Sequence, residues 1–187
     1  MELRRWTRAE YERMIDAGIF DSEERAELIG GEVLVMTPQK SPHATAVSLT
    51  LEALRVAFGS GHHVRAQLPL ALDPDSEPEP DVAVVPGSPR DYRHAHPTTA
   101  LLVVEVSDST LALDRDRKGS LYARAGIVEY WIVNLVDGVL EVYRDPESVR
   151  EARYGFAYRT VQRLGGPDHL TPLAAPAAHI RVGDLLP

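Results

Sequence analysis

Two acidic residues stand where the sequence predicts β-strands, and their placement suggests metal chemistry. Glu105 interrupts the otherwise apolar run 101–106, and Asp81 opens the apolar run 82–85. A buried carboxylate without a partner is costly, so Glu105 must be ion-paired, hydrogen-bonded, protonated or bound to a metal. Carboxylate oxygens are the ligands that hard divalent cations such as Mg²⁺ take. The alternative for each acid alone is an edge charge or a salt-bridge partner.

Lys118 is a third residue that could take part in this chemistry. One face of the predicted helix 112–125 is formed by Leu111, Asp114, Lys118, Leu121, Tyr122 and Ala125. This face has the spacing of an inward stripe, so we expect Lys118 to pack inward. One interpretation is a buried ion pair with a carboxylate of the preceding strand, which holds the helix in place. The other is that the ammonium reaches a metal-bound water or a phosphate.

These residues depend on surrounding helices and strands to bring them together. A capping-box pattern predicts a helix over 7–17, and a Ser-Pro pair predicts the start of a second helix over 41–58. A short helical turn is expected over 24–29. Strands are predicted over 32–36, 62–72, 81–85, 101–106, 128–134, 139–144 and near 154–163. The nearly continuous apolar strand 101–106 should be central and covered on both faces.

Composition limits the class of protein. The chain has 187 residues, 44% hydrophobic and 26% charged, which predicts a single globular domain spanning 1–187. It has no cysteine, which excludes disulfides, thiolate metal sites and thiol nucleophiles. The net charge of -8 opposes non-specific attraction to nucleic acid, so a DNA-binding surface would have to be local. Without an apolar leader or a membrane-spanning run, we expect a soluble, cytoplasmic protein with no membrane partner.

Several motifs occur in an order that can be compared with known families. They are Glu-Pro-Asp at 79–81, Val-Val-Glu-Val-Ser at 103–107, Asp-Arg-Lys at 116–118 and Leu-Tyr-Ala-Arg-Ala-Gly-Ile-Val-Glu-Tyr-Trp-Ile-Val at 121–133. Two further matching motifs are Glu-Leu-Ile-Gly-Gly-Glu-Val at 27–33 and Ser-Pro-His at 41–43. Together they resemble the Uma-type endonuclease family of the PD-(D/E)XK restriction-endonuclease-like superfamily. The resemblance covers a core of about 24–145. It implies an α/β fold with a mixed central sheet flanked by helices.

The resemblance also implies roles for individual residues. Asp81 corresponds to the motif aspartate and Glu105 to the motif acid, and with the Val106 carbonyl they would bind Mg²⁺ or Mn²⁺. The position that normally carries the family's lysine is Ser107 here, which implies that Lys118 has taken over that role. His43, at the start of helix 41–58, could donate to a phosphate or bind the metal, or else be exposed to solvent. Glu27 is a further candidate carboxylate.

The function that follows is metal-dependent hydrolysis of phosphodiester bonds, with DNA as the expected partner. The alternatives are an inactive nuclease-fold protein that serves as a binding or dimerisation module, and a hydrolase of a smaller phosphodiester. A homodimer is one assembly that the sequence leaves open. Other residues have structural interpretations as well. These are the histidines 62, 63, 94 and 96 as surface groups rather than metal ligands, the arginines 115, 117 and 124 as a solvated helix face rather than phosphate contacts, and Trp6, Tyr130 and Trp131 as core or dimer contacts.

Overall fold

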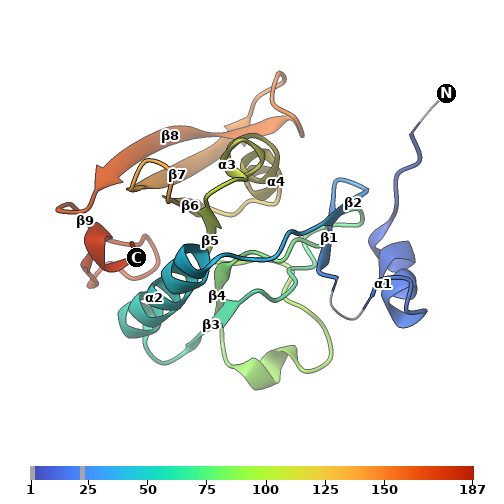
Figure 1. Cartoon of the computed structure of the whole chain (residues 1–187), viewed down its shortest axis with the longest axis horizontal. Coiled ribbons are helices and arrows are strands. Elements are labelled where there is room, and N and C mark those ends of the chain that lie inside the picture. The colour runs from blue at the N-terminus through green and yellow to red at the C-terminus, as the bar shows by residue number, and fades with distance from the viewer. Residues whose placement is uncertain (1–2, 22–23) are drawn as a thin grey trace.

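A six-stranded mixed β-sheet is the centre of the computed structural model, which describes residues 3–21 and 24–187 (Figure 1). The strand order is β3-β4-β5-β6-β7-β8, and β5 and β6 are the parallel pair in an otherwise antiparallel sheet. The strands are β3 (His62–Ala66), β4 (Val82–Pro86), β5 (Leu102–Ser107), β6 (Glu129–Asn134), β7 (Val139–Ser148) and β8 (Phe156–Gly165). The predicted α/β class with a mixed sheet is confirmed.

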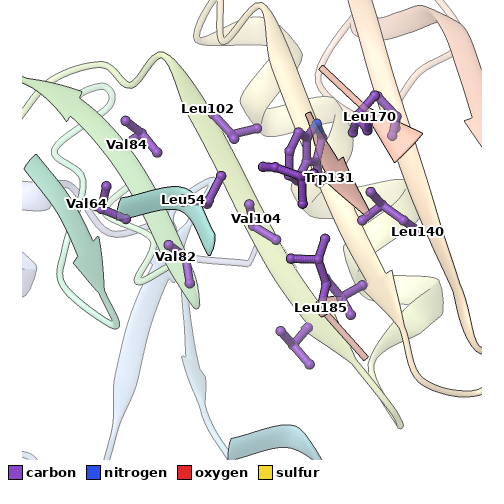
Figure 2. Packing of buried hydrophobic residues seen from close by; sticks show 14 of the residues in the cluster. Leu54, Val64, Val82, Val84, Leu102, Val104, Trp131, Leu140, Leu170 and Leu185 are labelled. Atoms are coloured by element: carbon purple, nitrogen blue, oxygen red, sulfur yellow. The ribbon is translucent and has the colours of Figure 1, made fainter. Parts of the chain in front are cut away.

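One face of the sheet is covered by α2 (Ser41–Phe58) and by the C-terminal segment. The C-terminal segment contains β9 (His169–Leu170), β10 (Ile180–Arg181) and the 3₁₀ turn Val182–Asp184. Figure 2 shows this core, in which Leu54 of α2 and Leu185 lie over Val104 and its neighbours. The alternation of side chains along a strand explains this arrangement, because Val104 and Val106 share one face of β5 and Glu105 points to the other.

The opposite face is covered by one helical segment that changes its geometry along its length. It consists of α3 (Leu111–Leu113), a π-helical turn (Asp114–Lys118) and α4 (Gly119–Arg124). Tyr122 and Ala123 of α4 pack with Val103 and Ile132 of the sheet. The predicted helix 112–125 is therefore present, but its middle turn is wider than an α-helix. Wide turns of this kind inside helices are frequently found at functional sites.

A small hairpin lies beside the sheet, next to α1 (Arg8–Asp16), as Figure 1 shows. Its strands are β1 (Ala26–Ile29) and β2 (Glu32–Val35), and the register joins them by a two-residue turn. Gly30 and Gly31 form this turn with φ of 56° and 78°, values that favour glycine. The helical turn predicted over 24–29 is wrong, because Ala26–Ile29 pairs as a strand with the residues that follow the two glycines.

The end of one predicted strand differs for a local reason. The predicted strand 62–72 ends at Ala66, because Gln67 has a φ of 52° and its N–H turns to the carbonyls of Pro80 and Asp81. A short 3₁₀ helix, Pro89–Tyr92, lies between β4 and β5. Within the described residues, no helix is long and apolar enough to cross a membrane.

Candidate active site

The two predicted acids lie next to each other because β4 and β5 are neighbours. The antiparallel register pairs Val82 with Val104. Asp81 precedes Val82 and Glu105 follows Val104, so the two acids lie side by side on neighbouring strands. The backbone N–H of Asp81 donates to Glu105 Oε2 at 3.3 Å, and the backbone N–H of Val106 donates to Asp81 Oδ2 at 2.9 Å. Both side chains are buried. The structure therefore brings the motif aspartate and the motif acid into one buried cluster.

Lys118 reaches this cluster from the helical segment that covers the face of the sheet to which Glu105 points. Its ammonium donates to Glu105 Oε1 at 3.0 Å and lies 3.1 Å from Glu27 Oε1. Lys118 is 1% exposed and Glu27 is fully buried. One ammonium thus lies between two buried carboxylates, which is the partnership that makes their burial tolerable. Glu27, the further candidate carboxylate, is brought in by β1.

The π-helical turn determines which side chains face the sheet. Gly119 donates its N–H to the carbonyl of Asp114, five residues earlier, and this carbonyl also accepts from the Tyr130 hydroxyl at 3.1 Å. The Asp114 side chain accepts from the Thr110 hydroxyl at 2.6 Å. Asp114 and Lys118 are both buried at the two ends of this turn. The wider turn therefore places an acid and a base on the same inward face.

His43 enters the site from the first turn of α2. Its Nε2 lies 3.2 Å from Asp81 Oδ2, and the ring also hydrogen-bonds the backbone carbonyl of Val106. Its Nδ1 is buried and has no hydrogen-bond partner among the described residues. The imidazole therefore faces two of the oxygen donors that the family resemblance implies for a metal.

Burial and neighbouring charges change the proton affinities of these groups. Burial raises the pKa of Glu105 to about 8, although the charge of Lys118 opposes the rise. Burial also disfavours the charged form of Lys118, but the charges of four acids, Glu105, Glu27, Asp114 and Asp81, together raise its pKa well above its ordinary value. Burial raises the pKa of Asp81, but the hydrogen bond and charge of His43, the N–H of Val106 and the charge of Lys118 together lower it below its ordinary value. Perturbed groups of this kind cluster at functional sites.

These side chains line a cavity of about 310 Å³. Its wall contains His43, Asp81, Glu105, Val106, Asp114 and Lys118, and Arg25, Lys40 and Asp108 lie among its other residues. All four predicted catalytic residues thus share one concave site, the usual location of small-molecule and catalytic chemistry. A larger pocket of about 610 Å³ lies between α1 and residues 92–98, and it contains none of these four.

The donor set of this cavity suits a hard divalent cation. Asp81 and Glu105 offer carboxylate oxygens, and the Val106 carbonyl offers a neutral one, which is the chemistry that Mg²⁺ prefers. Among the described residues, no group of three His, Cys, Asp or Glu side chains is arranged to hold a metal by itself. Water and substrate oxygens would therefore have to complete the coordination, as is usual for Mg²⁺.

The remaining candidate residues lie outside this cavity. His62 hydrogen-bonds the Phe58 carbonyl, His63 stacks on Tyr92, and His94 accepts from Arg93. The three helix arginines are ion-paired: Arg115 with Glu141, Arg117 with Glu32, and Arg124 with Asp73 and Asp75. Tyr130 and Trp131 are in the core, and Arg4 lies over the Trp6 ring.

Two residues in contact with the acids were not singled out from the sequence as site residues. Tyr122 donates its hydroxyl to Glu105 Oε1 at 2.6 Å, and Gln67 donates its amide to Asp81 Oδ1 at 3.2 Å. A signal for Tyr122 was available, because it lies four residues after Lys118 on the same helix face. No pattern indicated Gln67, since its position depends on the left-handed backbone after β3.

Comparisons with known proteins identify the family and the fold of this chain. The family model for Uma2, described as "Putative restriction endonuclease", matches residues 8–182. Among solved structures, the fold is similar to a crystal structure described as "a putative nuclease belonging to DUF820" from Anabaena variabilis. That likeness has a TM-score of 0.67 at 15% sequence identity and covers 91% of this chain and 94% of the other. No curated protein matches the sequence.

Proposed function

We propose that this chain, which belongs to the Uma2 restriction endonuclease family, is a divalent-metal-dependent endonuclease that hydrolyses phosphodiester bonds in DNA. The observation that carries the proposal is the convergence of Asp81, Glu105 and Lys118 at one buried cavity. Two carboxylates, a lysine and a backbone carbonyl meet there from three separate segments of the sequence. A purely structural ion pair would not require that cavity.

The chain's own residues would hold and orient the reacting groups. Asp81, Glu105 and the Val106 carbonyl would hold Mg²⁺ or Mn²⁺. Such a cation lowers the pKa of a bound water and neutralises charge on the phosphate. His43 would keep Asp81 oriented through its bond to Oδ2, and its free Nδ1 would remain for a further polar group.

Lys118 would have two effects. In the folded protein its ammonium offsets the negative charges of Glu27 and Glu105. Because it also lines the cavity, its fixed charge would stabilise negative charge that develops on the phosphate. This position corresponds to a lysine supplied by the helix after β5, in place of Ser107 on the strand itself.

An inactive binding module is the second candidate function, and two observations favour it. The three helix arginines that could contact phosphates are paired with acids, and the net charge is -8. Both features weaken electrostatic attraction to DNA. The endonuclease would cleave DNA through its carboxylates, whereas the binding module would cleave no DNA.

A cleavage assay separates these functions. Purified protein is incubated with supercoiled plasmid and with single-stranded DNA in Mg²⁺ or Mn²⁺, beside Glu105→Gln and the matched control Glu52→Gln on the exposed side of α2. We expect cleavage by the wild type and by Glu52→Gln, and a loss of roughly a hundredfold or more in Glu105→Gln. Equal cleavage by all three would indicate a contaminating nuclease. Inactivity of the wild type on every DNA would favour the binding module.

A further inference from the structure

The two carboxylate oxygens of Glu105 have different surroundings. Oε1 accepts from the Tyr122 hydroxyl at 2.6 Å and from the Lys118 ammonium at 3.0 Å. Oε2 accepts from the backbone N–H of Asp81 at the longer distance of 3.3 Å. Oε1 is therefore the anchored oxygen, whereas Oε2 lies on the side of Asp81 and keeps capacity for another partner.

The two donors to Oε1 are not equivalent. The Lys118 ammonium is shared with Glu27, which lies 3.1 Å away, and it sits at the end of a flexible stem. The Tyr122 ring is rigid, fully buried and packed against Tyr130 with ring centroids 5.0 Å apart. Its hydroxyl has a single described hydrogen-bond partner, Glu105. Tyr122 is thus the donor whose direction is determined by packing.

We propose that Tyr122 is a positioning residue, which holds Glu105 so that Oε2 faces Asp81 and the cavity. The proposal rests on the metal-dependent function proposed above, and it assigns to the buried tyrosine the orientation of a metal ligand. Because the hydroxyl is buried, it acts through Glu105 and does not touch the substrate. Partners that orient a ligating carboxylate commonly change metal affinity or activity by 10- to 100-fold when they are removed.

The test compares Tyr122→Phe with Tyr158→Phe. Tyr158 belongs to the same aromatic group and is also buried, but its hydroxyl donates to the backbone carbonyl of Ile127 at 2.8 Å. Each variant loses one buried hydroxyl, and only Tyr122→Phe loses one that contacts Glu105. Three measurements are made on the full chain: the melting temperature, the affinity for Mn²⁺ alone by calorimetry, and the crystal structure without metal.

We expect Tyr122→Phe to fold with a stability close to that of Tyr158→Phe and to bind Mn²⁺ at least tenfold more weakly, in the order of magnitude typical for such partners. Excess Mn²⁺ should restore much of its cleavage rate, which a general loss of structure would not allow. Its crystal structure should show the Glu105 carboxylate rotated or in two conformers, and that of Tyr158→Phe should not.

Other results would overturn the inference. These are an unchanged Mn²⁺ affinity in Tyr122→Phe, an equal loss in both variants, or unfolding of Tyr122→Phe alone, which would make the hydroxyl a stability element. If the wild type binds no Mn²⁺, the metal-dependent function fails. The crystal structures then decide the positioning role by themselves, and an unmoved Glu105 refutes it.

Discussion

Replacing Lys118 by methionine removes one charge from a buried group of three. The stem keeps its length, so packing changes little, but Glu27 and Glu105 lose the ammonium that lies 3.1 Å and 3.0 Å away. All three residues are at most 3% exposed, and water cannot replace the lost partner without opening the core. Breaking a buried pair on one side costs about 3–5 kcal/mol. For a chain of this size, that corresponds to a melting temperature lower by roughly 6–20 °C.

The assay is urea unfolding followed by circular dichroism, at about pH 8 and about pH 5. The loss should be greater at the higher pH, because burial raises the pKa of Glu105 to about 8 and its carboxyl is protonated at the lower pH, where it no longer needs the ammonium. Adding Glu105→Gln to Lys118→Met should restore part of the stability, since one of the two unpaired carboxylates is then neutral. A Lys118→Met protein as stable as the wild type at both pH values would refute the charge-balance argument.

Cleavage by the same variant tests the second role of Lys118. If the ammonium also stabilises charge on the phosphate, the folded fraction of Lys118→Met should cut at least roughly a hundredfold more slowly. Ser107→Lys in this background places an ammonium on the face of β5 that also carries Glu105, and partial recovery of cleavage would support the catalytic role. Cleavage at the wild-type rate by well-folded Lys118→Met would assign the residue to stability alone.

Three further results are expected. Asp81→Ala should abolish the calorimetric binding of Mn²⁺ that the wild type and Asp91→Ala, a change at an exposed acid, retain; equal binding by all three would place the metal elsewhere. Burial and the charge of Glu12 raise the pKa of Glu77 from 4.5 to about 7, so the folded state holds this proton more tightly than the unfolded chain does. The wild type should then lose about 3 kcal/mol relative to Glu77→Gln as pH rises through that window, and parallel stability curves would contradict this. A gel shift at about 150 mM salt without metal should show little complex with random duplex DNA, because the net charge is -8; strong binding would reveal a basic surface that the ion-paired arginines do not provide.

The sequence by itself determined most of the elements and most of the candidate residues. An acid inside an apolar strand and a lysine on an apolar helix face are visible in the order of residues, because period 2 and period 3.6 determine which side chains point inward. Glu105 and Lys118 were therefore expected to be buried, and both are. The motif order was also sufficient to suggest the family that the comparison later showed.

Only the tertiary structure decided how these residues meet. The contact of Asp81 with Glu105 depends on the register of β4 and β5, and the approach of Glu27 depends on a hairpin whose first strand was expected to be helical. His43 comes from a helix on the other face of the sheet. Each of these contacts joins segments distant in the chain, and local periodicity carries no information about which distant segments pair. The bond from Tyr122 to Glu105 is of the same kind: the helix period places the tyrosine inward, but the packing of that helix on β5 selects its partner.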